Sequence, residues 1–504
     1  MADSPAPSSV QAPSSNVRAA VGGAPTGAAV CVVFLAFVLR LAGLGQQSLW
    51  FDEAFSVLLA RRGLAEIVAD TAKDTMPPLY YWLLHFWGTG PSVDFYPRSI
   101  SLLAGTLSVA LVYLVGRALL DARTGLAGAL VAAVSPFHVY FSQETRMYAL
   151  LGVWVLMAAY GFVLGWQRGR PVGWALYGGG TLLAVYTHAL GWLPSAALLL
   201  WAGAGSAKHP EKLLPPIAGL GAAFVVYLPW FLVVLGQASK VFSSFWAGAA
   251  SPLSPVASLY LFFMGPLAGA NFFPIALALV LLALGLTVPT ALRSSHPNSG
   301  QLRLLWAWAA FPPLALMALS LVQPVYLERV LIGAAFPVYL LLGWVITSLP
   351  FSKLGAVLGV LILGAGLWGM RNSYTYPALA KPPMREAAAL ARWAWQAGGP
   401  VLHTSDGSLL PFLLYAPELP NLLLEGDPEY ALHTARVRST VDSLGITPVS
   451  AAHALNGARR FLLIVSPDHS VAYQEEAARE FDARYQRLSN DVIGGIIVRS
   501  YAVR

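Results

Sequence analysis

The chain has 504 residues, of which 57% are hydrophobic and 11% are charged, and its mean hydropathy is +0.62. Soluble proteins carry roughly 25% charged residues, so this composition excludes a string of soluble domains and indicates a polytopic membrane protein. The net charge of +7 comes mostly from basic residues spread singly between apolar stretches, which is typical of topology signals and excludes nucleic-acid binding. The single cysteine, Cys31, excludes a disulfide framework.

Residues 1–23 are rich in Ser, Pro and Ala and predict a disordered cytoplasmic tail. Apolar stretches long enough to cross about 30 Å of hydrocarbon follow. We expect spans near residues 26–44, 98–118, 123–141, 147–166, 172–189, 190–206, 213–235, 272–292, 304–322, 330–349 and 353–371. The proline-interrupted stretch 255–270 fits a re-entrant segment as well as a span, so the predicted fold class is an all-α polytopic membrane domain of about 11–13 transmembrane helices.

Basic residues fall in alternate loops between these spans, and the positive-inside rule places those loops in the cytoplasm. They are Arg117 and Arg123, Arg168 and Arg170, Lys208 and Lys212, Arg293 and Arg303, and Lys353. The intervening loops then face outward, and most acidic residues before residue 373 lie in or beside them. We therefore expect the chemistry on the outer face.

The sequence divides into the tail 1–23, a transmembrane domain at 24–372 with a first outer loop at 45–97, and a region at 373–504. Charged residues are concentrated in this last region, where helical and extended patterns alternate. Helices are predicted near 387–395 and 471–485, and strands near 400–404, 460–466 and 493–501. This region is expected to be a soluble extracytoplasmic α/β domain.

Two adjacent carboxylates, Asp52 and Glu53, follow the first span within the aromatic segment Leu49–Ser56. A carboxylate at a membrane surface can serve as a general base. The alternative is an interfacial amphipathic helix whose aromatic residues anchor it in the headgroup region.

Five further groups of residues lie at the predicted outer face. Tyr80 and Tyr81 follow Pro77-Pro78, Arg98 opens the second span, and a short turn at 142–146 is followed by Tyr148. The remaining polar candidates are Glu144, Arg146, His188 and Arg329. Each has a structural explanation as well, such as aromatic anchoring, snorkelling, mutual pairing of Glu144 with Arg146, or a hydrogen-bonding histidine at a span end.

Taken together, these residues place carboxylates and three arginines on one side of one membrane. Arginines suit a phosphate, and a carboxylate suits an attacking hydroxyl, so the combination favours a lipid-linked phosphate ester whose sugar faces outward. A divalent metal ion on Glu53, Glu144 and His188 is a further hypothesis, although these residues lack metal-motif spacing.

The motifs "LWFDEAFS", "MPPLYYWLLHFW", "YPRSISLLAGTLSVALVYLVGRAL", "SPFHVYFSQETRMYAL" and "YTHAL", in this order, resemble the membrane-embedded GT-C glycosyltransferases of the family 39 type. That group includes protein O-mannosyltransferases and the aminoarabinose transferase that modifies lipid A. The resemblance covers residues 26–350. It implies inverting transfer of a sugar from a polyprenyl-phosphate donor to a lipid, glycan or protein acceptor, outside the bacterial inner (plasma) membrane.

The resemblance also implies roles for individual residues. Asp52 matches the catalytic aspartate, with Glu53 completing the pair. The matching arginines Arg98, Arg146 and Arg329 are expected to bind the donor phosphate or to position the loop. Glu144, Tyr80, Tyr81, Tyr148 and His188 are expected to position the substrate. Lipid A-modifying members have a lysine directly before Pro-Pro, where this chain has Met76; Lys73 lies one helical turn away as a candidate replacement.

Two other classes of function were weighed. A transporter or flippase of a lipid-linked saccharide would show repeat symmetry and polar mid-membrane helices, whereas here charge is scarce within the spans. A scaffold that only displays residues 373–504 would leave the first-loop carboxylates unexplained. The sequence therefore favours the enzyme.

Overall fold

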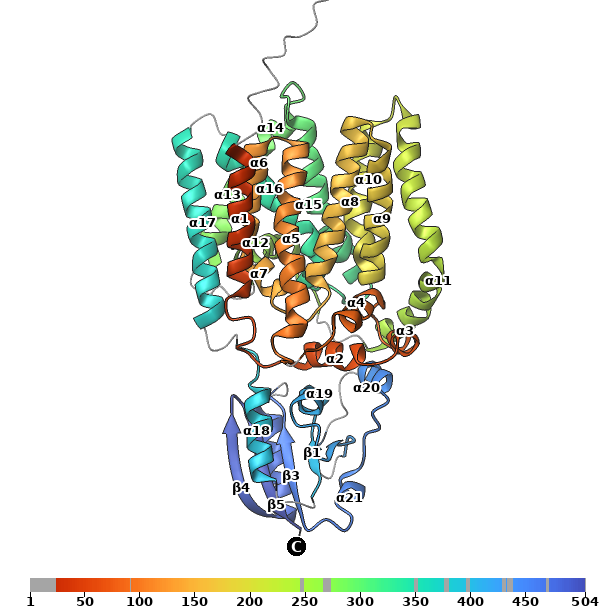
Figure 1. The fold of residues 1–504 in the computed structure, drawn as a ribbon, viewed down its shortest axis with the longest axis vertical. Helices are drawn as coiled ribbons and strands as arrows, with labels where there is room; N and C mark the ends of the chain where they lie inside the picture. The colour runs from red at the N-terminus through yellow and green to blue at the C-terminus, as the bar shows by residue number, and fades with distance from the viewer. Residues whose placement is uncertain are drawn as a thin grey trace, which may run out of the picture.

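The computed structural model describes residues 24–90, 92–244, 249–265, 273–348, 352–375, 380–395, 399–427, 432, 438–467 and 471–503. The predicted disordered tail, residues 1–23, lies outside the described residues. A helical bundle forms one half of the molecule, and a smaller mixed region lies beneath it (Figure 1).

The bundle follows the predicted apolar stretches closely. Its helices are α1 (Ala24–Leu41), α5 (Tyr96–Leu119), α6 (Ala122–Val134), α7 (Pro136–Ser142), α8 (Tyr148–Arg168), α9 (Pro171–Thr187), α10 (Trp192–Gly205), α11 (Leu214–Ser244), α12 (Ser254–Met264), α13 (Phe273–Gly285), α14 (Val288–Leu292), α15 (Ser299–Ser320), α16 (Ile332–Ser348) and α17 (Ser352–Thr375). Within the described ranges, six helices are long and apolar enough to cross a membrane, and shorter apolar helices accompany them. The chain is a multi-pass membrane protein.

The structure differs from one predicted span and bears on the stretch 255–270, for which two interpretations were open. The span predicted at 123–141 is two helices, α6 and α7, bent by 63° at Ser135, because Pro136 begins a new helix there. Helix α12, in the stretch 255–270, has 11 residues and rises about 16 Å, which is too short to cross the hydrocarbon. The re-entrant or interfacial interpretation therefore fits the described part of this stretch.

Glycines allow close approach between neighbouring helices. A Cβ atom on Gly173 would lie 2.4 Å from the backbone nitrogen of Gly165, and one on Gly116 would lie 2.6 Å from the Cα of Gly125. Helices α8 and α9, and α5 and α6, therefore pack backbone to backbone, as small residues permit within membranes.

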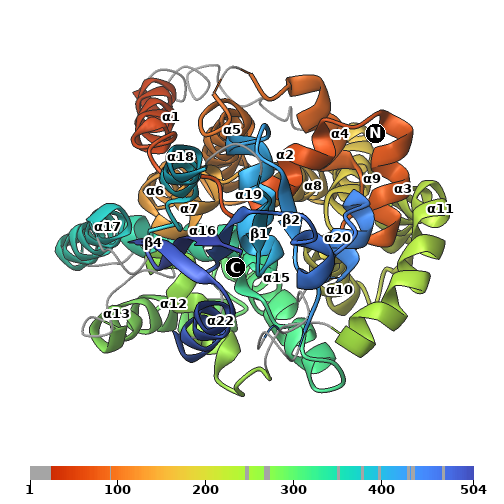
Figure 2. The same cartoon turned by 90° about the horizontal axis from the view of Figure 1, so that it is seen from below.

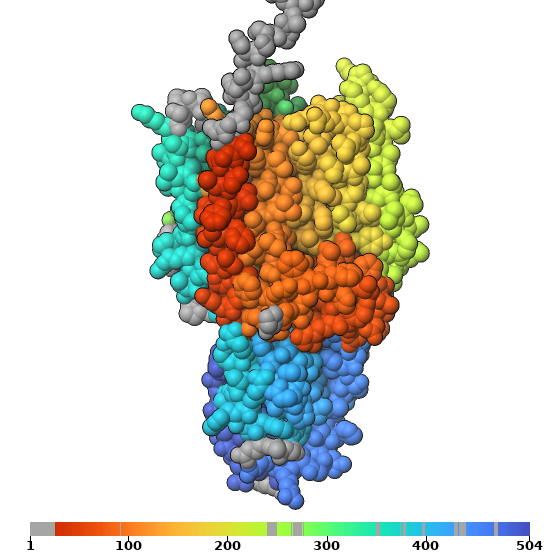
Figure 3. Space-filling view, in the orientation of Figure 1, coloured from red at the N-terminus to blue at the C-terminus, as the bar shows by residue number. Residues whose placement is uncertain are grey.

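The two ends of the bundle differ. The basic loops between α5 and α6, α8 and α9, α10 and α11, and α14 and α15, together with the start of α17, lie at the end opposite the C-terminal region (Figure 1). The first loop forms α2 (Phe51–Ala60), α3 (Leu64–Lys73) and α4 (Leu79–Trp87), which lie across the other end. The space-filling view shows this loop as a layer between the bundle and the C-terminal region (Figure 3).

The C-terminal region is a small α/β unit with a five-stranded sheet in the order β2-β1-β3-β5-β4. Strands β2 (Asn421–Leu423), β1 (Val401–His403) and β3 (Arg460–Val465) are parallel to one another. Strand β5 (Ile496–Ala502) pairs antiparallel with β3 on one side and with β4 (Gln486–Ile493) on the other. Its helices are α18 (Met384–Ala394), α19 (Asp406–Tyr415), α20 (Arg438–Leu444), α21 (Ala451–Ala454) and α22 (Val471–Arg484). Seen from below, α19 and β1 lie over the middle of the bundle (Figure 2), where α19 packs against α2.

Candidate active site

Helix α2 follows the first span and carries the adjacent carboxylates Asp52 and Glu53 in its first turn. Acidic residues are favoured there because they interact with the positive end of the helix dipole. The two side chains point to different environments, since adjacent helical residues are about 100° apart. The Asp52 side chain is 16% exposed, whereas Glu53 is fully buried.

Asp52 lies between two guanidinium groups. Its Oδ2 atom is 3.1 Å from Arg329 Nη1 and 3.9 Å from Arg146 Nε. Arg146 also donates to the backbone carbonyl of Asp52 at 3.2 Å and to Ser56 Oγ at 3.3 Å, so it holds the helix as well as facing the carboxylate. We call Asp52, Arg146 and Arg329 the Asp52 site.

Glu53 is the centre of a second, buried arrangement. It accepts hydrogen bonds from Arg98 at 2.6 and 2.7 Å, from the backbone nitrogen of Thr145 at 2.8 Å and from Lys381 Nζ at 2.9 Å. Burial alone would raise the pKa of Glu53, but the charges and hydrogen bonds of Arg98 and Lys381 outweigh burial and lower it from 4.5 to about 2. Glu53 is therefore ionised at neutral pH and joins four segments of the chain.

The guanidinium group of Arg98 is buried and donates its hydrogen bonds to groups within the protein. Besides Glu53, it donates to the carbonyl oxygens of Leu44, Gln47 and Ser48, and its side chain is 2% exposed. Of the two roles that the resemblance implies for Arg98, this geometry favours loop positioning over a contact with the donor phosphate. Glu144 also belongs here, because its Oε1 atom lies 3.3 Å from Lys381 Nζ and not against Arg146. We call Glu53, Glu144, Arg98 and Lys381 the inner charge cluster.

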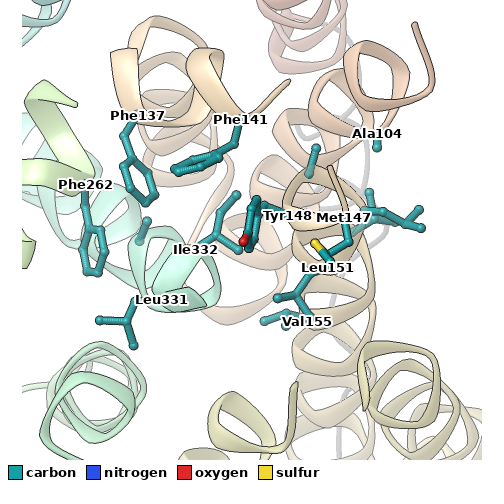
Figure 4. Close-up of a cluster of buried hydrophobic side chains, with 14 of the residues drawn as sticks. Ala104, Phe137, Phe141, Met147, Tyr148, Leu151, Val155, Phe262, Leu331 and Ile332 are labelled. Carbon is teal, nitrogen blue, oxygen red and sulfur yellow. The ribbon is translucent and has the colours of Figure 1, made fainter. Parts of the chain in front are cut away.

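Aromatic residues back the Asp52 site on its membrane side. The guanidinium of Arg329 lies 5.9 Å from the centre of the Tyr148 ring, a cation–π distance. Figure 4 shows Tyr148 among the buried side chains of Phe141, Met147 and Ile332. The imidazole ring of His188 is buried, and its centre lies 6.3 Å from the centre of the Tyr148 ring.

The first-loop tyrosines are also buried. Tyr81 packs edge-on against Tyr80 at 5.6 Å and Phe55 at 6.1 Å, and it interacts electrostatically with Arg146 and Asp52. Burial raises its pKa, so its hydroxyl remains a hydrogen-bond donor. The buried Tyr81 hydroxyl and Arg146 Nε make no hydrogen bond within the described part of the chain. These are donors that a bound sugar or phosphate could satisfy.

Lys73 is placed differently. Its ammonium group lies 3.1 Å from Asp70 on the same helix, α3, and its side chain is 52% exposed. Asp70 is shared with Arg62 at 2.6 Å. The structure therefore places Lys73 in a surface ion network of the first loop.

The metal hypothesis gains no support from the geometry. Among the described residues, no group of three or more His, Cys, Asp or Glu side chains is arranged to hold a metal ion. Lys381 lies between Glu53 and Glu144, so the two carboxylates that the hypothesis paired already share a cation.

Comparisons with known proteins identify the fold of the chain. Residues 75–233 match the family model described as dolichyl-phosphate-mannose-protein mannosyltransferase. The apo crystal structure of ArnT from Cupriavidus metallidurans aligns over 95% of this chain and 98% of its own, with a TM-score of 0.63 and 12% identity. The chain has the GT-C fold.

Two more structures share this fold with the chain. ArnT from Cupriavidus metallidurans bound to undecaprenyl phosphate aligns with a TM-score of 0.59 and 12% identity, over 95% of this GT-C protein and 98% of that chain. The apo oligosaccharyltransferase of Archaeoglobus fulgidus aligns with a TM-score of 0.51 and 12% identity, over 92% and 73%. The comparison with curated proteins found no match.

Sequence reasoning missed Lys381 of this GT-C protein. It lies between the end of α17 and the start of α18, just past the change in composition at residue 373. The motifs that carried the resemblance all precede residue 350, so only a lone lysine before Pro382-Pro383 marked this position.

Proposed function

We propose that this chain is an integral membrane glycosyltransferase that moves a sugar from a polyprenyl-phosphate donor to an acceptor hydroxyl, with inversion. The observation that carries the proposal is Asp52 between Arg329 and Arg146, at one end of a GT-C bundle. The undecaprenyl phosphate bound to the ArnT of Cupriavidus metallidurans supports the donor class.

The Asp52 site suits the chemistry of this reaction. The acceptor oxygen would attack the anomeric carbon while its proton passes to the Asp52 carboxylate. The bond from that carbon to the phosphate oxygen would break, and the guanidinium groups of Arg146 and Arg329 would stabilise the negative charge left on the phosphate. Attack opposite the leaving group inverts the anomeric configuration.

The assay uses purified full-length protein in liposomes with a radiolabelled polyprenyl-phosphate sugar, and offers lipid, glycan and protein hydroxyls in parallel. We expect labelled acceptor and free polyprenyl phosphate to appear together. If the intact donor crossed the bilayer without losing its sugar, the protein would be a flippase and the proposal would be wrong.

We also propose the domain division at residues 24–372 and 373–504 and a location in the bacterial inner membrane, with the N-terminus in the cytoplasm and the C-terminal domain outside. The basic loops at the end of the bundle opposite the C-terminal region support this orientation. A reporter that is active only in the cytoplasm, fused after Arg504, should be silent. A strong signal from this fusion would reverse the assignment of faces.

Changing Arg146 or Arg329 to alanine should weaken donor binding by about 1.5–3 kcal/mol, which is typical for loss of a hydrogen bond to a charged group. Native mass spectrometry of each purified variant with polyprenyl phosphate measures this. The matched control is Arg117→Ala, because Arg117 is exposed at the opposite end of the bundle. Donor binding equal to that of the control in both variants would assign these arginines to folding alone.

A further inference from the structure

Residues 380–383, directly before α18, lie at the underside of the bundle, next to the first loop. There the side chain of Lys381 is 10% exposed, although lysine is rarely buried without partners. Its ammonium group lies 2.9 Å from Glu53, 3.3 Å from Glu144 and 5.9 Å from the centre of the Tyr140 ring. A residue outside all the recognised motifs therefore contributes to the buried charge beside the Asp52 site.

Lys381 connects two of the three segments that carry the Asp52 site, those of Asp52 and Arg146. Glu53 is the neighbour of Asp52 on α2, and Glu144 lies two residues before Arg146 in the turn between α7 and α8. Glu53 also accepts a hydrogen bond from the backbone of Thr145 in that turn. A displacement of either carboxylate would therefore move Asp52 relative to Arg146.

The connection through Lys381 is strong because its ammonium group neutralises buried carboxylates. Glu53 forms ion pairs with Arg98 and Lys381, whereas Glu144 forms an ion pair with Lys381. The Glu144 side chain is 2% exposed, so removal of the ammonium group would leave a buried carboxylate without its ion-pair partner. Breaking a buried pair in this way is far more disruptive than losing a surface ion pair.

Other residues of the C-terminal region bind the first loop, 45–97, as well. Arg385 lies 2.8 Å from Asp94, and the hydroxyl of Tyr415 donates to Asp94 and accepts from the backbone nitrogen of Leu49. Arg62 of the first loop donates to the carbonyl of Leu444 at the end of α20. Figure 3 shows the resulting continuous contact between the two parts.

We propose that Lys381 is a positioning residue for sugar transfer, through which the C-terminal region fixes the relative placement of Asp52 and Arg146. The proposal rests on the proposed function. Lys381 acts through Glu53 and Glu144 and not on the substrate, so its loss should lower turnover more than donor binding, because misplacement of catalytic groups by about 1 Å can cost about 100-fold.

The kinetic test compares Lys381→Met with wild type in the full-length protein. We expect kcat to fall about 10- to 100-fold while the KM for the donor changes less than about threefold. Lys381→Arg, which keeps a cation, should recover most of kcat. Lys353→Met is the matched control, because Lys353 is exposed at the far end of the bundle, and it should behave as wild type.

A double variant tests the mechanism of positioning. In Lys381→Met/Glu144→Gln the unpaired buried charge is gone, so kcat should exceed that of Lys381→Met alone, measured against Glu144→Gln in a double-mutant cycle. Additive losses in kcat, or a Lys381→Met variant with normal kcat, would overturn the proposal. If Lys381→Met fails to fold, kcat is compared between wild type, Lys381→Arg and the double variant instead.

Hydrogen exchange separates this proposal from the proposed function. Lys381→Met should increase amide exchange in residues 51–60 and 143–147, and Lys353→Met should not. If wild type transferred no sugar but exchange rose in both segments, the proposed function would fail and the link through Lys381 would stand. Unchanged exchange in both segments would overturn the link itself.

Discussion

Replacement of Asp52 by asparagine is expected to lower the rate of sugar transfer at least about 100-fold, the usual lower bound for loss of a positioned general base. Asparagine keeps the size of the side chain but removes the charge that accepts the acceptor proton. Because Asp52 is partly exposed and faces Arg329 and Arg146, the variant should still fold and still bind the donor phosphate.

The measurement is single-turnover transfer by purified, monodisperse protein saturated with donor, which separates chemistry from binding. Asp121→Asn is the matched control: Asp121 caps α6 at the opposite end of the bundle, and asparagine caps helices equally well. If Asp52→Asn turned over at a rate close to that of this control, the base would have to be another residue, and Glu53 would be tested next.

The sequence could predict the helices because a membrane requires long apolar stretches, and these leave a strong signal. It could not predict the break between α6 and α7, since hydropathy continues across Ser135-Pro136 and a proline can also lie within a span. Strand β4 was missed for a different reason. It is an edge strand whose side chains are mostly exposed and polar, so it lacks the apolar pattern that marked β3.

In the candidate site, too, the sequence could not predict which individual side chains are buried or which ion pairs they form. Adjacent acids at positions 52 and 53 look equivalent in the sequence, and only the rotation of α2 decides that Glu53 is buried and Asp52 is not. The arginines were likewise indistinguishable until Arg98 was found surrounded by backbone carbonyls. The partner of Glu144 depends on a contact between residues 144 and 381, which no local pattern encodes.

The second large effect is expected from Arg98→Ala, which should lower the free energy of unfolding by about 3–5 kcal/mol, the cost of breaking a buried ion pair from one side. Glu53 and the carbonyl groups of the first loop would lose their shared donor. Thermal unfolding in detergent measures the change, with Arg117→Ala as the control for a lost exposed arginine. If Arg98→Ala had the same unfolding temperature as this control but bound no donor, Arg98 would be assigned to binding of the donor phosphate.

The pH dependence of the free energy of unfolding tests whether Glu53, the partner of Arg98, is a buried structural anion. Its pKa is lowered from 4.5 to about 2 in the folded protein, so its stabilising effect is fully present above about pH 4.5 and is lost as the pH falls toward 2. The gap in stability between wild type and Glu53→Gln should therefore be constant from pH 8 to 5 and narrow only below that. If the gap narrowed between pH 7 and 6, Glu53 would titrate near neutrality, as expected of a catalytic acid or base and not of a buried structural anion.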